Sequence, residues 1–289
     1  MQRFFDALQA TQSPACEQSV DNVEIIHRLR VSCRRASASL KVFRPLLRRR
    51  AAFIQKWLRR VRRAAGPVRD IDVFLSGLKD RALPPDAAAF VREELLNRRA
   101  EFESKLRRIA HQATRRKIQR KFRQVLRKGW RDHEQTLESF TQQSLEKSRE
   151  AFHQLLPIHN PTFEELHDLR IAAKRVRYTI ETLGLEKADA PPPTDVESEK
   201  RSDSQQPTKA LHSQFSHAKL VAMQELLGRL NDHVTAQAML QSLLANLPAD
   251  ELAAQLAGQI VAEHAAAVDL RLAFLELQDR DPGFNIASE

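Results

Sequence analysis

The chain has 289 residues, and its 47 Lys and Arg outnumber its 37 Asp and Glu, which gives a formal net charge of +10. Two cysteines, Cys16 and Cys33, are too few for a disulfide framework, and no apolar run reaches the roughly 18 residues of a membrane-spanning helix. These features exclude a disulfide-rich or membrane-spanning protein, predict a reduced cytoplasmic chain, and favour a polyanionic partner without identifying it.

The composition predicts an all-α fold, because good helix formers dominate, glycine occurs only 7 times, and no alternating β-branched run indicates a sheet. In chain order, the predicted helices span residues 1–10, 20–48, 50–65, 68–82, 86–111, 114–127, 130–156, 162–185, 211–229, 231–247 and 249–278. The predicted breaks lie at Gly66-Pro67, Pro84-Pro85, Gly129, Pro157, Asn160-Pro161 and Pro248. Pro45 should end or kink the second helix near Arg44.

One segment, residues 186–210, differs from the rest in composition. It holds four of the 13 prolines and almost no apolar residues. Such a segment cannot repay the entropy of its ordering by burying apolar surface. We therefore expect a disordered insertion here.

Two parts of the sequence resemble each other. Residues 26–35 are similar to 166–175, with an offset of 140 that places His27 opposite His167. Residues 66–70 are similar to 228–232, with an offset of 162. The offsets differ by 22 residues, close to the 25 residues of the insertion. The sequence thus predicts one domain over 1–280 made of two repeats, about 15–156 and 160–280, with the insertion inside the second.

Each repeat begins with an amphipathic basic helix. At about 100° per residue, apolar positions form one stripe on each helix, and basic positions led by a histidine form a row on another face. The stripes are Leu29, Cys33, Ala36, Leu40, Phe43 and Leu47, and Leu166, Leu169, Ala173, Val176, Ile180 and Leu183. The rows are His27, Arg30, Arg34, Lys41 and Arg48, and His167, Arg170, Lys174 and Arg177, with Tyr178 beside the second. Few acids neutralise these rows, which favours an anion contact, and we expect free helix N-terminal N–H groups to assist the histidines.

The motifs His-x-x-Arg-x-x-x-Arg-Arg at 27–35 and His-x-x-Arg-x-x-x-Lys-Arg-x-Arg-Tyr at 167–178 resemble those of the CHAD family, the conserved histidine α-helical domain. The segment Arg69-Asp70-x-Asp72-Val73 adds to this resemblance, which is strongest over 20–80 and 160–240. Two departures are Ser37, where the first motif usually has arginine, and Asn231, which replaces the arginine of the second Arg-Asp pair.

The resemblance implies two helical bundles related by a pseudo-twofold axis, with a basic channel between them that binds inorganic polyphosphate. It implies binding without catalysis, without a cofactor and without a metal, and association with polyphosphate granules. Carried over residue by residue, it nominates His27, Arg30, Arg34, Arg35, Lys41, His167, Arg170, Lys174, Arg175 and Arg177 as polyphosphate-binding residues.

Two other functions stay open. A protein that binds nucleic acid through its backbone would share the basic surface, although aromatic residues for base stacking are only 6% of the chain. A metal-dependent HD phosphohydrolase is less favoured, because His167-Asp168 and Asp232-His233 lack further convergent ligands and Arg28 stands at the Asp168 position of the first repeat. We expect Asp70, Asp72 and Asp232 to act as helix caps or arginine partners.

Further basic segments, at 59–63 and 115–123, could extend the ligand surface or could simply be solvated. The sequence does not decide between these interpretations.

Overall fold

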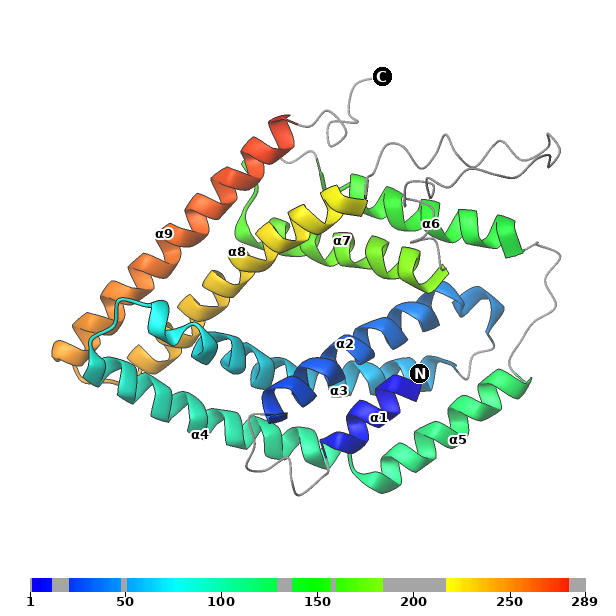
Figure 1. The fold of residues 1–289 in the computed structure, drawn as a ribbon, viewed down its shortest axis with the longest axis horizontal. Helices are drawn as coiled ribbons and strands as arrows, with labels where there is room; N and C mark the ends of the chain where they lie inside the picture. Colours follow the sequence, from blue (N-terminus) through cyan, green and yellow to red (C-terminus); the bar gives the residue numbers. More distant parts are fainter. Residues whose placement is uncertain are drawn as a thin grey trace, which may run out of the picture. The chain divides into compact units, whose positions relative to one another are not determined.

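The computed structural model describes residues 2–11, 21–47, 51–128, 137–156, 160–183 and 217–280. Within these ranges every regular element is helical, as predicted (Figure 1). The α-helices are α1 (Gln2–Ala10), α2 (Asp21–Val42), α3 (Ala51–Ser76), α4 (Pro85–Ile109), α5 (Gln112–Lys128), α6 (Leu137–His153), α7 (Phe163–Leu183), α8 (His217–Leu244) and α9 (Glu251–Arg280). Two short 3₁₀ helices, Arg44–Leu46 and Leu78–Asp80, follow α2 and α3. None of the described helices is both long and apolar enough to cross a membrane.

The helix boundaries confirm the predicted breaks at Pro84-Pro85, Asn160-Pro161 and Pro248 and correct two others, while Gly129 and Pro157 lie outside the described residues. α2 ends at Val42, just before the 3₁₀ turn that contains Pro45, as expected from the fixed backbone of proline. The break predicted at Gly66-Pro67 is wrong, since α3 runs through Pro67 without interruption. The break predicted between residues 229 and 231 is also wrong, because α8 is continuous from His217 to Leu244. The predicted insertion at 186–210 lies outside the described residues.

The chain forms two compact units. The first comprises Met1–Leu137 with Leu230–Val268, and the second comprises Glu138–Arg229 with Asp269–Glu289. Helices α8 and α9 each contribute a segment to both units. The repeats at 15–156 and 160–280, their pseudo-twofold relation and the channel remain predictions.

The first unit has two apolar clusters. One is built by α1, α2, α3, α5 and the end of α4, and includes Phe4, Leu29, Ile54, Leu106 and Ile118, each at most 1% exposed. The other joins α3 and α4 to segments of α8 and α9, through residues such as Phe74, Val91, Leu240 and Leu256. Because both clusters use α3 and α4, these two helices hold the unit together.

The predicted apolar stripes are confirmed. In α2 and the turn after it, Leu29, Cys33, Ala36, Leu40 and Leu47 are buried, and Phe43 packs against them. In α7, Leu166, Leu169, Ala173 and Val176 are buried, while Ile180 and Leu183 are partly exposed. Burial of one stripe leaves the basic residues of each helix at or near the surface, since they lie on a different face.

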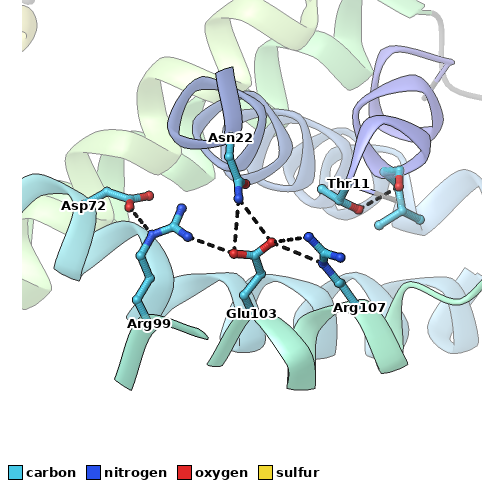
Figure 2. Close-up of polar contacts among 7 residues, drawn as sticks. Thr11, Asn22, Asp72, Arg99, Glu103 and Arg107 are labelled. Atoms are coloured by element: carbon cyan, nitrogen blue, oxygen red, sulfur yellow. Dashed lines mark hydrogen bonds and ion pairs between the residues drawn. The ribbon is translucent and has the colours of Figure 1, made fainter. Parts of the chain in front are cut away.

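A carboxylate on α4 fixes the start of α2 (Figure 2). The Asn22 amide donates to both oxygens of Glu103, at 3.1 and 3.2 Å. Glu103 also accepts from Arg99 at 2.8 Å and from Arg107 at 2.7 Å. Arg99 in turn donates to Asp72 of α3 at 2.6 Å. This chain of contacts links α2, α3 and α4 through polar side chains that are all at least partly buried.

Candidate polyanion-binding surface

Three residues of the basic row of α2 lie beside the neighbouring helix α3. The two helices pack antiparallel, because Arg30 contacts Gly66 and Asp70, whereas the later Arg34 interacts with the earlier Arg62. Among charged groups, His27 is influenced most strongly by Arg69. Charge interactions also connect Arg34 with both His27 and Arg62. The five cationic side chains His27, Arg30, Arg34, Arg62 and Arg69 therefore form one group, which we call the α2–α3 cluster.

Arg30 is the most structurally engaged member of this cluster. Its Nη1 donates to the carbonyl oxygen of Gly66 at 2.6 Å and to that of Ala65 at 3.3 Å, and it lies 3.3 Å from Asp70 Oδ1. Proline has no N–H to donate within a helix, so Pro67 weakens the hydrogen bonding of α3 locally. The carbonyl that lacks a helical partner because of Pro67 is that of residue 63, so the contacts of Arg30 with the carbonyls of Ala65 and Gly66 tie α2 to α3 beside the proline and do not replace the missing hydrogen bond.

His27 lies in a cationic environment. Its partial burial and the positive charges of Arg69, Arg34 and Arg30 lower the pKa of the imidazole, and Glu24 only partly opposes them. In the free protein the surroundings therefore disfavour the protonated form. A bound anion would reverse this effect, since negative charge favours the imidazolium.

The cysteine beneath the cluster is an inert core residue. Cys33 is fully buried, and desolvation raises the pKa of its thiol to about 12, although Arg62, Arg30 and Arg34 act in the opposite direction. Cys33 is a free thiol, whereas Cys16 lies outside the described residues. The partial desolvation of Arg62, together with the charge of Arg34, lowers the pKa of that arginine as well.

Two members of the cluster were not singled out by the sequence patterns. Arg62 was placed only in an undecided basic segment, and Arg69 only in a family motif. Both lie on the same face of α3, because they are seven residues apart, which is about two helical turns. That spacing was visible in the sequence, but assigning it to the site required the antiparallel packing of α2 on α3.

The other nominated residues of α2, Arg35 and Lys41, are exposed. On a helical projection Lys41 lies near Arg34, whereas Arg35 is about 100° away from it. The structure thus groups three of the five nominated α2 residues with Arg62 and Arg69, and leaves Arg35 and Lys41 at the periphery.

The α7 row consists of His167, Arg170, Lys174 and Arg177 in the second unit. His167 is exposed, as is the nominated Arg175, and the other three are partly buried. Arg177 is 3.3 Å from Glu181 and lies over the ring of Tyr178 at 5.2 Å. Tyr178 itself is buried, so it supports the row from below and offers little surface for stacking.

Free backbone N–H groups at the helix N-termini were expected to assist the two histidines in binding an anion, but neither histidine lies beside such groups. At the start of α7, Thr162 and Glu165 form a capping box, in which Glu165 N donates to Thr162 Oγ1 at 3.2 Å and Thr162 N donates to Glu165 Oε2 at 2.7 Å. His167 and His27 both lie beyond the first turn of their helices, where backbone N–H groups are already used. This part of the sequence-based prediction is wrong.

One hydrogen bond in the second unit joins two positions whose counterparts in the first unit also lie close enough to interact by charge. Gln224 Nε2 of α8 donates to the carbonyl of Ala173 in α7 at 3.1 Å. By the two offsets of the repeat, Gln224 corresponds to Arg62 and Ala173 to Cys33, which also influence each other. At the matched positions 62 and 224 the first segment has a charged arginine and the second has a neutral glutamine.

The expected roles of the acidic residues are confirmed in part. Asp70 and Asp72 are arginine partners, of Arg30 and Arg99 respectively, but both lie inside α3 and do not cap it. Asp232 is likewise inside α8 and is exposed. His233 lies 2.7 Å from Glu263, which also accepts from Arg81 at 2.7 Å.

A separate depression of about 690 Å³ lies beside α4, lined by Asn22, Leu96, Arg99, Ala100, Glu103, Ser104, Arg107, Arg108 and His111. Its two inner arginines, Arg99 and Arg107, are already held by Glu103. The depression is therefore less suited to an anion than the α2–α3 cluster, because Glu103 already pairs with two of its three arginines.

The chain is similar to solved structures and to one family of proteins. The structure is similar to the CHAD domain from the plant Ricinus communis, at 17% sequence identity and a TM-score of 0.69, covering 99% of this chain and 89% of that one. It is also similar to PptA from Streptomyces chartreusis, at 16% identity and a TM-score of 0.70, covering 96% and 94% of the two chains. No curated protein matches the sequence. The sequence pattern described as the CHAD domain matches residues 1–189, well over half of the chain, and with the shared all-helical fold this establishes that the protein belongs to the CHAD domain family.

Proposed function

We propose that the protein binds inorganic polyphosphate without catalysis, using the α2–α3 cluster and the α7 row. The observation that supports this most strongly is the packing of α2 on α3 through Arg30. It places His27, Arg34, Arg62 and Arg69 where their charges act on one another. Like charges so arranged repel one another, and a chain of phosphates would relieve that repulsion. Arginine forks and point charges at short intervals suit a ligand that has negative charge at every unit and no bases.

The proposal extends to all the nominated residues. Arg34, Arg62 and Arg69 of the cluster and Arg170, Lys174 and Arg177 of the α7 row would contact phosphate directly, and His27 and His167 would donate hydrogen bonds from their rings. Arg30 would have a double role, because it also ties α2 to α3 through Gly66 and Asp70. Arg35, Lys41 and Arg175 are exposed and would add longer-range attraction. A cytoplasmic location and association with polyphosphate granules are part of the same proposal.

Binding to nucleic acid is less well supported. Single-stranded ligands are usually stacked on exposed aromatic rings. Among the described aromatic residues, Trp57 and Tyr178 are buried, and Phe53 is exposed on α3. A catalytic role involving His233 is also less well supported, since its ring is engaged by Glu263 within a cluster that includes Arg81.

The decisive experiment is a binding titration at several salt concentrations. Long-chain polyphosphate should bind far more tightly than orthophosphate or duplex DNA at matched charge, and its affinity should fall steeply with salt through counterion release. The double variant Arg34→Gln with Arg62→Gln should lose at least about tenfold in affinity, because two charge-assisted contacts are removed.

The matched control is Arg28→Gln with Lys79→Gln, which removes the same charge from exposed positions outside the cluster. It should bind almost as the unmodified protein does. Equal competition by duplex DNA, or equal losses in the two double variants, would contradict the proposal.

A further inference from the structure

A second cationic surface lies on α5 of the first unit. This helix contains eight Lys and Arg residues and no Asp or Glu over Gln112–Lys128. Its neighbour α4 has a mixed sequence, in which Glu103 pairs with Arg99 and Arg107. Pairing of charges four residues apart is the usual way in which a helix neutralises a basic face. α5 lacks the acids that would allow it.

The exposed face of α5 presents four arginines in a line. Arg116, Arg120, Arg123 and Arg127 are all exposed, and we call them the α5 arginine row. Their spacing of four, three and four residues keeps them within about 60° on one side of the helix, over a length of about 16 Å. Within the described part of the chain, no ion pair involves any of them.

The opposite face of α5 anchors the row. Ile118 and Val125 are buried in the first apolar cluster, and Phe122 packs against it. The arginines are therefore held outward by a fixed helix. Such a row loses less conformational freedom on binding than a row on an unanchored helix, because its backbone is already ordered.

The α5 arginine row is separate from the α2–α3 cluster. Lys121 of α5 lies 3.9 Å from the ring centre of Phe53, which marks the edge of α3 that faces α5. Arg60, exposed and seven residues after Phe53, lies on this same edge. Arg62 is two residues further along, which is about 200° around the helix. The Arg62 side of α3, which belongs to the α2–α3 cluster, thus lies away from the edge of α3 that faces α5.

We propose that the α5 arginine row is a second polyphosphate-binding surface, so that one molecule holds two polyphosphate segments at once. This inference rests on the proposed function. A straight row of arginines without an accompanying set of exposed aromatic or base-reading side chains fits a ligand made of phosphates alone. With two binding surfaces on one unit, the protein could bind one long polyphosphate at two places or link two polyphosphate molecules.

The test uses the full-length protein with Arg116, Arg120, Arg123 and Arg127 all changed to Gln. The buried face of α5 is unchanged in this variant, and circular dichroism and the melting temperature check its folding. The control changes Arg28, Arg44, Lys79 and Arg92, four exposed cations of the first unit, to Gln. Both proteins lose the same charge, so a difference between them reports the row and not the net charge.

Two probes are used: short-chain polyphosphate in calorimetry and long-chain polyphosphate in light scattering. The α5 variant should bind one short chain fewer per molecule than the control does. Its affinity for long chains should fall by at least about tenfold, with a salt slope that is smaller by about 3 to 4. Large scattering particles should form with long chains and the control, and should be absent with the α5 variant.

Identical stoichiometry and scattering for the α5 variant and the control would overturn this proposal, while the Arg34 and Arg62 variant would still report on the proposed function. Loss of duplex DNA binding with polyphosphate binding intact would assign the row to nucleic acid and overturn it as well. If the unmodified protein bound no polyphosphate at all, both proposals would fail together.

Discussion

Arg30 donates a 2.6 Å hydrogen bond to the carbonyl of Gly66, one residue before the proline that α3 accommodates. The same guanidinium reaches Asp70, so one side chain of α2 contacts one full turn of α3. A residue nominated as a ligand contact from its place in a basic row is therefore also part of the fold. This dual use separates Arg30 from Arg34, which shares its face of α2.

The first prediction concerns that dual use. Arg30→Gln should lower the free energy of unfolding by about 1–3 kcal/mol, because charge-assisted hydrogen bonds to Gly66 and Asp70 are lost from a largely buried position. Urea denaturation measures this change. Arg35→Gln, on the exposed side of the same helix, should stay within about 0.5 kcal/mol of the unmodified protein. Equal stabilities for the two variants would show that Arg30 acts only on the ligand.

The second prediction concerns Gly66. A Cβ at this position would lie 3.5 Å from Arg30 Nη1, an ordinary van der Waals contact, so there is room for alanine. Gly66→Ala should therefore raise the free energy of unfolding by about 0.5–1 kcal/mol, as expected for glycine replaced inside a helix. Thermal and urea denaturation measure it.

Gly228 is the natural control, because it occupies the matching position of the second repeat and a Cβ added there would meet no described atom within 4 Å. Gly228→Ala should gain stability by a similar amount. Loss of stability in Gly66→Ala alone would mean that the contact between Arg30 and the α3 carbonyls cannot tolerate even a methyl group.

The third prediction concerns Glu103, which binds Asn22, Arg99 and Arg107 at once. Glu103→Gln should destabilise the protein by about 2 kcal/mol, because two partly buried arginines lose their shared carboxylate. The exposed Glu101→Gln on the same helix should have little effect.

The pH dependence of stability checks the same contacts. Burial raises the pKa of Glu103, but the hydrogen bonds from Arg107 and Asn22 and the charge of Arg99 outweigh it, and the net pKa is below the ordinary 4.5. A carboxyl whose pKa is lower in the folded state stabilises the fold above its unfolded pKa. That contribution should disappear as the pH falls below about 4.5, and should be absent in Glu103→Gln. A variant with an unchanged acid profile would contradict this role.

The sequence predicted the features that depend on periodicity. The α2 stripe and the first two-thirds of the α7 stripe are buried as expected, because a 3.6-residue repeat of apolar side chains places them on one face of a helix. The two wrong helix breaks have a different origin. Pro67 is a local breaker, but Ala65 and Val68 on either side of it are buried in the first apolar cluster, which holds α3 in place through the proline. In α8, buried Met223, Leu227 and Leu230 continue one apolar face across the predicted break.

Three of the five residues of the α2–α3 cluster were nominated from the sequence, and two were not. Periodicity within α2 identified His27, Arg30 and Arg34 as one row. It could not identify Arg62 and Arg69 as their neighbours, because that depends on which face of α3 meets α2. Nor could it show that Arg30 is engaged by backbone carbonyls, since no sequence pattern marks a side chain that bonds to another helix's main chain.

The fourth prediction links His27 to ligand binding. In the free protein, partial burial and the charges of Arg69, Arg34 and Arg30 hold the pKa of His27 below 6.5. A bound polyphosphate would raise this pKa, so the complex would bind more protons than the free protein does. By linkage, affinity should then increase as the pH falls from about 7.5 to 5.5. His27→Gln should flatten this increase, whereas His153→Gln should not, although burial lowers the pKa of His153 too and that residue lies outside the basic rows. Titrations at constant ionic strength provide the measurement, and a pH profile that is the same in all three proteins would show that His27 does not face the ligand.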